Sequence, residues 1–302
     1  MRGLFRRCGP LAFEFDYKIT EEGMTVERLL RDEWRLGRKM VHELRMAGAV
    51  TLAGGGKPRW NEELAAGVVL TLNVPETESA YVPEEGDLTV AYEDGHCLVV
   101  HKPAGIAVHP NVPGGNGTLL NRLTERSLKE GRPYAEHVHR LDQGTSGLVL
   151  IARHPVAKAL FDRMLEEKAI RRTYLAEISG RLRRPKGTID APIGRDRHHA
   201  TRRRISPGGQ TAVTHYEAVR AGNGTSLVSL DLDTGRTHQI RVHLAHLGHP
   251  IIGDTLYGGR PSPAGYRLQA DRLSFTHPFT GEPHRIHDPV QPDWLKESGR
   301  IE

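Results

Sequence analysis

The spacing of apolar residues between Met24 and Val74 predicts two helices followed by two short strands. The two helical stripes consist of Val26, Leu29 and Leu30, and then of Met40, Val41 and Leu44. The strand-like runs are residues 49–52 and 68–72. Basic residues lie beside the stripes, Arg38 and Lys39 among them. A unit of this size is too small to house an enzyme site.

A different pattern follows this unit. The stretch from Pro75 to Gly86 is acidic and bounded by prolines, without apolar periodicity, which is typical of a linker. Strand-like runs then alternate with helical candidates, which predicts one α+β domain. These runs are residues 88–92, 97–101, 147–152, 174–178, 213–219 and 227–232. The predicted boundaries are 13–75 for the small domain, 76–86 for the linker and 87–295 for the large domain.

Two segments of the large domain have helical spacing. One helix is expected to begin at Pro155, because proline is favoured in the first turn and apolar residues repeat behind it. Its apolar positions are Val156, Leu160 and Met164. A second helix is predicted over residues 237–247. Its inward positions are Ile240, Leu244 and Leu247, with His238, Gln239 and Arg241 on other faces.

The composition is that of an ordinary folded chain with a basic balance. Of the 302 residues 37% are hydrophobic, and 42 Lys and Arg against 37 Asp and Glu give a formal charge of +5. This excess favours a polyanionic partner. The densest basic stretch contains Arg195, Arg197, Arg202, Arg203 and Arg204. It is either a nucleic-acid contact or a solvated loop.

Neither cysteines nor apolar runs indicate secretion or a membrane. Cys8 and Cys97 are far apart and have no partner pattern, so a reducing compartment fits. The start of the chain is basic, but Glu14 and Asp16 interrupt the apolar stretch behind it, so no secretory signal is expected. No apolar run has transmembrane length. We therefore expect a cytoplasmic protein.

The sequence predicts neither a metal nor a nucleotide cofactor. The most suggestive histidines are His243, His246 and His249, but they cross a predicted helix end at Gly248 and lack a nearby carboxylate or cysteine to complete a shell. Walker and Rossmann glycine patterns are absent from the sequence.

The segment from His139 to Leu150 contains the strongest candidate for catalysis. Asp142 is followed by a Gly-containing polar turn that runs directly into an apolar strand, so its carboxylate should lie at a sheet edge. On its own, such an aspartate often only accepts hydrogen bonds from backbone N–H groups in an Asx-turn.

The larger pattern resembles the RluA-type family of RNA pseudouridine synthases over about residues 84–290. The motif around Asp142, His139-Arg140-Leu141-Asp142, resembles that family's catalytic motif. Further motifs follow the family's order: Lys102-Pro103-Ala104-Gly105, Arg172-Thr173-Tyr174-Leu175, residues 234–241, Gly248-His249-Pro250 and Gly253-Asp254. Residues 24–74 resemble an S4 RNA-binding domain, although Thr25 to Leu29 stand where that family usually has Arg-Leu-Asp. A basic helical hairpin remains the alternative.

The resemblance implies a fold and an activity. The expected fold is a central mixed, largely antiparallel sheet flanked by helices, with a small S4-like α/β module. Asp142 would attack a uridine at either ribose C1′ or base C6, and C5 would then rejoin the sugar. No cofactor is required for this isomerisation.

The resemblance also implies roles for individual residues. Arg241 would hold the carboxylate of Asp142 in its charged form. Tyr174 would stack on the displaced base and could take the C5 proton, and Leu268 would form an apolar wall of the uracil pocket. Arg140 would fill the gap left by the flipped base. Gln269 stands where the family usually has histidine.

Structured RNA is the partner that the resemblance implies. The S4-like module favours large-subunit, 23S-type ribosomal RNA, with Arg38 and Lys39 among the expected contacts. RNA contacts are also expected from Arg195, Arg202, Arg203 and Arg204. Transfer RNA is an alternative substrate, and a non-catalytic RNA-binding or ribosome-assembly factor is an alternative function. No obligatory protein partner and no membrane are inferred, and the modified uridine cannot be identified from the sequence.

Overall fold

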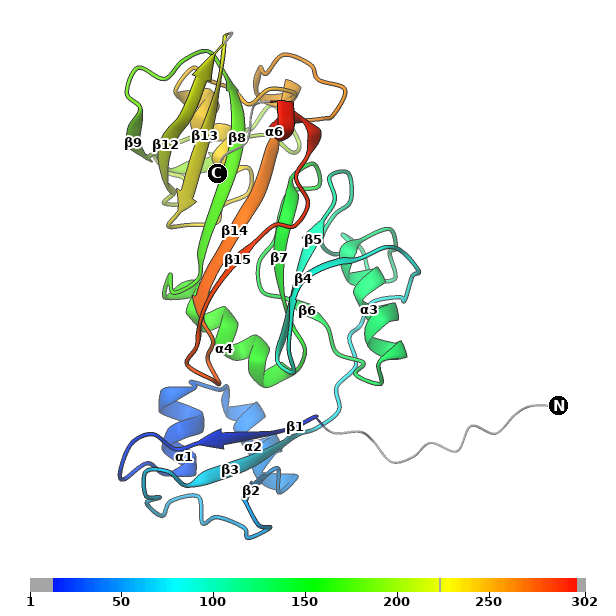
Figure 1. Ribbon diagram of the computed structural model, residues 1–302, viewed down its shortest axis with the longest axis vertical. Helices are drawn as coiled ribbons and strands as arrows, with labels where there is room; N and C mark the ends of the chain where they lie inside the picture. The colour runs from blue at the N-terminus through cyan, green and yellow to red at the C-terminus, as the bar shows by residue number, and fades with distance from the viewer. Residues whose placement is uncertain (1–12, 223, 298–302) are drawn as a thin grey trace, which may run out of the picture.

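The computed structural model describes residues 13–222 and 224–297, which form a small N-terminal part and a larger part (Figure 1). The small part has an antiparallel sheet in the order β1-β3-β2. Its elements are β1 (Phe13–Lys18), α1 (Val26–Arg28) with a π-helical turn (Leu29–Glu33), α2 (Arg38–Met46), β2 (Val50–Leu52) and β3 (Val69–Val74). The two predicted helical stripes and both predicted strands therefore lie within these elements.

Strand β1 was not among the predicted elements. Phe13, Phe15 and Tyr17 alternate with Glu14 and Asp16, which is the period of a strand with one buried face. The strand pairs with β3 along its whole length, from Phe13 opposite Val74 to Lys18 opposite Val69. The acidic residues that argue against a secretory segment thus form the polar side of an edge strand. Cys8 lies outside the described residues.

The large part is built on a ten-stranded sheet. Its main path runs β4-β5-β7-β14-β8-β13-β12-β9, with β15 beside β14 and β6 beside β7. Among the described strands only β7 and β14 pair in parallel, so the predicted mixed, largely antiparallel sheet is confirmed. The first strands are β4 (Thr89–Glu93), β5 (Cys97–Lys102), β6 (Glu136–His137), β7 (Ser146–Ala152), β8 (Arg171–Ser179) and β9 (Lys186–Asp190). The later ones are β12 (Val213–Gly222), β13 (Thr225–Leu232), β14 (Leu268–Thr276) and β15 (Pro283–His287).

Helices and one hairpin complete the large part. The helices are α3 (Leu119–Lys129), α4 (Pro155–Glu166), α5 (Gln239–His246) and α6 (Asp293–Glu297), with a 3₁₀ turn (Thr255–Tyr257). The hairpin consists of β10 (Ile193–Arg195) and β11 (Arg203–Ile205). Helix α4 begins at Pro155 as predicted, and the ring of His154 caps it by accepting a hydrogen bond from the N–H of Ala157 (3.2 Å). Within the described helices, none is long and apolar enough to cross a membrane.

Helix α5 differs from the prediction in which faces are buried. Leu247 was expected inside but is 37% exposed, whereas Gln239 and Arg241 are buried. The amide of Gln239 donates to the carbonyl of Val213 and to Thr214 Oγ1, both at 3.0 Å, and its oxygen accepts from Thr234 (2.8 Å). Buried polar groups are tolerated when they are hydrogen-bonded. The helix is therefore enclosed on several faces, which apolar spacing alone does not indicate.

The two parts share an aromatic core. Phe15 and Trp34 of the small part contact Phe279 of the large part, with ring centroids 5.0 and 5.6 Å apart. Phe279 also stacks on His96 at 4.0 Å. Helix α4, which lies against the small part in Figure 1, adds apolar side chains to the same cluster. The small part is therefore held in a fixed orientation by packing.

The stretch between the parts, residues 75–88, contains no helix or strand. It nevertheless contacts the large part, because Ser79 Oγ donates to the carbonyl of Ala135 (2.8 Å) and Tyr81 donates to Glu136 (3.0 Å).

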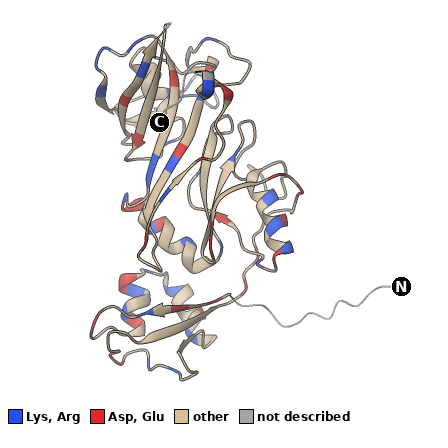
Figure 2. Ribbon diagram, viewed as in Figure 1, with Lys and Arg blue, Asp and Glu red and all other residues tan. Residues whose placement is uncertain are grey.

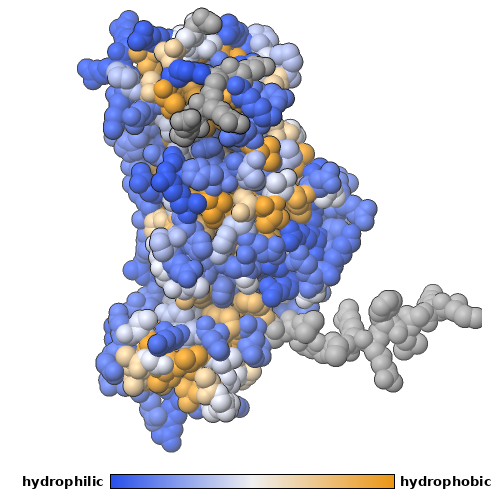
Figure 3. Space-filling model, in the orientation of Figure 1, coloured by the Kyte–Doolittle hydropathy of each residue, from blue (hydrophilic) through white to orange (hydrophobic). Residues whose placement is uncertain are grey.

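Basic and acidic residues are interspersed over both parts (Figure 2). The face in Figure 3 is mostly hydrophilic, with apolar residues in separate groups.

Replacing Phe279 by alanine is expected to lower the free energy of unfolding by about 2 kcal/mol or more, because the ring packs against both parts. Urea unfolding measures this change. The control is Val219→Ala at a side chain that is 41% exposed, where we expect a change within about 0.5 kcal/mol. Equal effects of the two substitutions would show that the shared core contributes little.

Candidate active site

The residues predicted for catalysis line one cleft of about 790 Å³. Asp142 lies in the turn before β7, Tyr174 on β8, Arg241 on α5 and Leu268 at the start of β14. Arg140 is exposed and lines the same cleft. The fold thus brings together side chains from segments that are far apart in the sequence.

The turn that carries Asp142 depends on two glycines. The N–H of Thr145 donates to the carbonyl of Asp142 (3.0 Å), which closes the turn. A Cβ at Gly144 would lie 2.6 Å from the ring of Tyr266. Gly147 has a φ of +114°, and a Cβ there would lie 2.3 Å from the carbonyl oxygen of Ala270 on β14. Only glycine permits these approaches, which place the Asp142 turn against β14.

Arg241 joins Asp142 to a second carboxylate. Its Nη1 lies 3.3 Å from Asp142 Oδ2, while Nε and Nη2 donate to the two oxygens of Asp254 at 2.7 and 2.9 Å. The bidentate pair with Asp254 orients the guanidinium. Although burial opposes the charged form, these hydrogen bonds raise the pKa of Arg241 above its ordinary value. The rings of Tyr257 and Tyr266 lie 5.0 and 4.5 Å from the guanidinium carbon.

His238 is a further neighbour of Asp142, with Nε2 at 3.9 Å from Oδ2. The N–H of Arg203 donates to the hydroxyl of Tyr257 (2.9 Å), and that hydroxyl lies 2.8 Å from His238 Nδ1. If the tyrosine donates its proton to Nδ1, the imidazole proton is on Nε2 and faces Asp142. Burial lowers the pKa of His238, which favours this neutral form. The residue has a φ of +59°, an uncommon conformation outside glycine.

Lys102 holds the loop beside Asp142. Its side chain is fully buried, and Nζ donates to the carbonyls of Pro103 and Ile106 (both 2.8 Å) and of Gln143 (3.1 Å). Burial lowers the pKa of Lys102 to about 8, although the charge of Asp142 opposes this shift. The lysine of the Lys-Pro-x-Gly motif is therefore part of the support of the Asp142 turn.

Tyr174 and Leu268 form buried parts of the cleft wall, at 4% and 3% exposure. Burial raises the pKa of Tyr174, so its phenol is neutral at ordinary pH. Gln269 is turned to other partners, because its amide donates to Asp288 (2.7 Å) and to the carbonyl of Val290 (2.6 Å). Gln269 therefore belongs to the packing behind the cleft and is not among the described residues that line it.

Apart from Arg140, the predicted RNA contacts lie outside the cleft. Arg38 and Lys39 are exposed at the start of α2 in the small part. The other predicted contacts lie on or beside the β10–β11 hairpin: Arg195, Arg202, Arg203 and Arg204. Arg202 lies 3.6 Å from Asp196. None of these six arginines and lysines is among the described residues that line the cleft.

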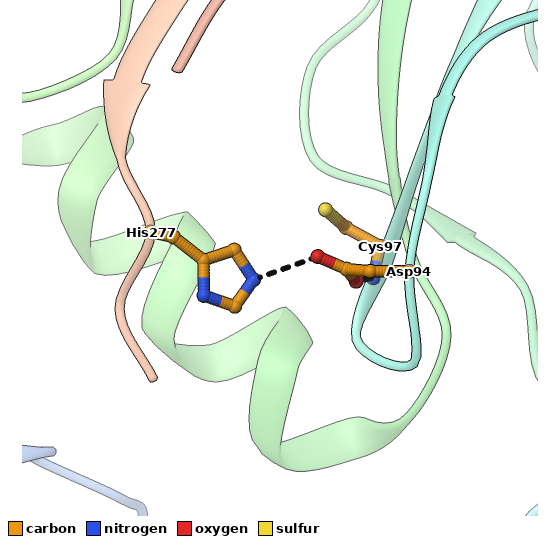
Figure 4. Close-up of side chains that lie close together, drawn as sticks. All are labelled: Asp94, Cys97 and His277. Carbon is orange, nitrogen blue, oxygen red and sulfur yellow. Dashed lines mark hydrogen bonds and ion pairs between the residues drawn. The ribbon is translucent and has the colours of Figure 1, made fainter. Parts of the chain in front are cut away.

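A separate cluster has the residue types of a metal site, namely Asp94, Cys97 and His277 (Figure 4). Its atoms have other partners. Nδ1 of His277 accepts from the N–H groups of Phe279 and Thr280, so its proton is on Nε2, 3.1 Å from Asp94 Oδ2. Burial raises the pKa of the Cys97 thiol far above its ordinary value. Because Nδ1 of His277 is taken by two backbone N–H groups and its Nε2 already pairs with Asp94, this donor set fits a structural contact.

Sequence reasoning did not assign roles to several residues at the site. These are Lys102, His238, Asp254, Tyr257 and Tyr266. The motifs that contain Lys102, His238 and Asp254 were recognised, and membership of these motifs was the one indication in the sequence that the three residues belong to the site. Nothing in their spacing indicated that Asp254, thirteen positions after Arg241, accepts two hydrogen bonds from the Arg241 guanidinium.

Comparisons with known proteins agree with this geometry. Residues 96–246 match the model of the RNA pseudouridylate synthase family, and residues 13–70 match that of the RluD ribosomal pseudouridine synthase N-terminal domain. The chain belongs to the RNA pseudouridylate synthase family. It is an RNA pseudouridine synthase, as the resemblance to RluA-type enzymes predicted, and its first part matches an RluD-type N-terminal domain.

Individual relatives support the same assignment. An uncharacterized RNA pseudouridine synthase, YhcT of Bacillus subtilis, is 51% identical over 70% of this chain and 72% of its own length. A ribosomal large subunit pseudouridine synthase D of Xanthomonas campestris is 39% identical over 80% of this chain and 78% of its own. The solved human RNA pseudouridylate synthase domain containing 1 superposes with a TM-score of 0.55 at 26% identity, covering 71% of this chain and 96% of that one.

Asp254→Asn should lower kcat on the order of 10 to 100-fold, because a misplaced Arg241 no longer orients Asp142. The affinity for RNA should change by less than about twofold, since Asp254 is buried away from solvent. Single-turnover kinetics and RNA binding measure the two quantities. Glu177→Gln is a matched control, because Glu177 is a buried carboxylate paired with Arg267 outside the cleft. A loss confined to affinity, or an equal loss of kcat in the control, would contradict this role.

Lys102→Met should remove one pH dependence of stability. Between pH 8 and 10.5, the shifted and ordinary pKa values of this group, the unfolded chain binds more protons than the folded chain. The contribution of Lys102 to the free energy of unfolding therefore rises with pH. The variant also leaves three carbonyls without their donor, so it should be less stable throughout, by an amount that grows across this window. Urea unfolding at several pH values measures the difference in the free energy of unfolding between the wild type and the variant. If this difference stays constant or shrinks as the pH rises, the pKa of Lys102 is not lowered by burial.

Proposed function

We propose that this RNA pseudouridine synthase modifies uridine in large-subunit ribosomal RNA and that Asp142 is its nucleophile. The observation that carries the proposal is the contact between Arg241 and Asp142 at the wall of a cleft (3.3 Å). Asp142 has a side chain 25% exposed, so it can reach a substrate, whereas Arg241 is 7% exposed and well held. A carboxylate with a fixed cation beside it is suited to nucleophilic attack.

The proposed reaction is an isomerisation within one nucleotide. Asp142 attacks C1′ or C6 of the uridine, and the bond between C1′ and N1 breaks. The base then rotates, C5 bonds to C1′, and the bond to Asp142 breaks, which restores the carboxylate. A base removes the proton from C5, and N1 gains a proton from solvent. The neutral phenol of Tyr174 is a weak base, so its burial supports stacking on the uracil more than proton transfer. Leu268 supplies an apolar wall for the base.

Base flipping is the second part of the proposal. Removing a uridine from a stacked RNA costs about a few kcal/mol. Arg140 is exposed at the cleft, and its planar guanidinium is suited to stacking in the vacated position.

We further propose that residues 13–75 form an RNA-binding domain joined by residues 76–86 to a catalytic domain of residues 87–295. Arg38 and Lys39 are exposed there and available to phosphates. Ribosomal RNA is favoured because relatives named ribosomal large subunit pseudouridine synthase D cover most of the chain. A cytoplasmic location follows from this substrate. Transfer RNA is the second candidate.

Asp142→Asn should abolish release of tritium from C5-tritiated uridine in a large-subunit ribosomal RNA transcript, because the amide is not a nucleophile of comparable strength. RNA binding at several salt concentrations should remain nearly unchanged. Asp162→Asn on α4, where Asp162 pairs with Lys158, is the matched control and should retain activity. Full turnover by the Asp142→Asn variant would exclude the nucleophile, and wild-type protein without turnover on any cellular RNA would favour a binding factor.

A further inference from the structure

A second cavity, of about 440 Å³, lies next to the catalytic cleft and is lined by three arginines. Arg195 and Arg203 come from the β10–β11 hairpin, and Arg236 comes from the segment before α5. No acidic side chain is among the described residues that line this cavity. We propose that it binds a backbone phosphate of the substrate RNA, beside the nucleotide held in the cleft. This inference rests on the proposed function only in taking RNA as the ligand.

The hairpin itself is built in a way that favours an anion. Arg195 and Arg203 are directly opposite each other in the β10–β11 ladder. Like charges in such a pair destabilise a sheet unless a counter-charge lies between them. The only acidic side chain of the hairpin, Asp196, lies near Arg202. In the described structure, Arg203 Nε is buried without a hydrogen-bond partner. A ligand with several acceptor oxygens would satisfy this group and relieve the repulsion.

The third arginine is already oriented. Arg236 Nε donates to the carbonyl of Thr211 (3.0 Å), which fixes the guanidinium and leaves its other N–H groups for a ligand. Gly209 permits the loop to close the cavity, because a Cβ there would lie 2.5 Å from the backbone of Ile193. The cavity is therefore shaped by fixed backbone on one side and by three guanidinium groups on the other.

The position of the cavity indicates that it binds a phosphate adjacent to the nucleotide in the cleft. Arg236 and Thr237 line both the cavity and the catalytic cleft, so the two are contiguous. A nucleotide in the cleft would therefore extend its backbone into the arginine cavity. Three guanidinium groups match the tetrahedral oxygens of phosphate, and RNA offers one such group per nucleotide.

Phosphate binding in this cavity would also affect Asp142, the proposed nucleophile. The backbone N–H of Arg203 donates to Tyr257, whose hydroxyl contacts His238, and His238 faces Asp142. A phosphate held by the Arg203 side chain would steady the strand from which this chain of contacts begins. A phosphate bound in the cavity would thus fix the position of the RNA backbone and would also stabilise the contacts that lead from Arg203 to Asp142.

The test compares Arg203→Gln and Arg236→Gln with Arg220→Gln, which removes the same charge from an exposed arginine on β12 that lines neither the cavity nor the cleft. The probe is a large-subunit ribosomal RNA transcript, and the readout is the slope of log K against log salt. Each cavity variant should reduce the slope, because each removes one of the guanidinium groups around the phosphate. The double variant should reduce it further, but by no more than about 0.7 to 0.9, the value for one phosphate contact. Arg220→Gln should leave the slope nearly unchanged.

Other outcomes overturn the proposal. If Arg203→Gln and Arg220→Gln have equal effects, or if the double variant loses two contacts, the cavity does not hold a single phosphate. The two cavity variants lie in different elements, so we do not expect them to disturb folding in the same way. The midpoint of thermal unfolding, measured for each variant, shows whether a loss of RNA binding comes from misfolding. Tritium release by the wild type on the same transcript tests the proposed function separately. An inactive wild type with the expected slopes would refute the substrate assignment and keep the phosphate site.

Discussion

The site depends on one buried guanidinium shared by two carboxylates. A buried charge is destabilising unless it is paired and hydrogen-bonded, and Arg241 meets this condition chiefly through Asp254, which is 1% exposed on its side chain. The contact to Asp142 is longer, and Asp142 is the more exposed partner. This asymmetry separates two tasks. One carboxylate holds the cation in place, and the other remains accessible to a substrate.

The sheet explains how these groups meet. Strand β14 lies between β7 and β8 and pairs in parallel with β7 only at its start, beside the Asp142 turn. Gly147 permits that close approach. Buried Lys102 fixes the adjacent loop through three backbone carbonyls. Helix α5 presents Arg241 from the other side, and its buried Gln239 and His243 are hydrogen-bonded inside the protein. These contacts hold the Asp142 turn and Arg241 in place.

Two features outside the cleft, the fixed small part and the arginine cavity, would suit a long polyanionic ligand such as RNA. The small part is fixed to the large part by aromatic packing around Phe279, so its basic α2 has a set direction relative to the cleft. The arginine cavity is contiguous with the cleft and is joined to Asp142 through Tyr257 and His238. An RNA bound along these surfaces would be positioned by its backbone before any base is displaced.

The sequence by itself determined the family, six strands of the ten-stranded sheet, helix α4 and the candidates Asp142, Tyr174 and Arg241, because motifs and apolar periodicity are local properties. Even β1 has the period of a strand, although it was not recognised. Only the tertiary structure decided that Asp254 anchors Arg241, that α5 is buried on its polar faces and that Gln269 turns away from the cleft. Each of these depends on hydrogen-bond partners contributed by distant segments, and chain spacing carries no record of which segments will meet.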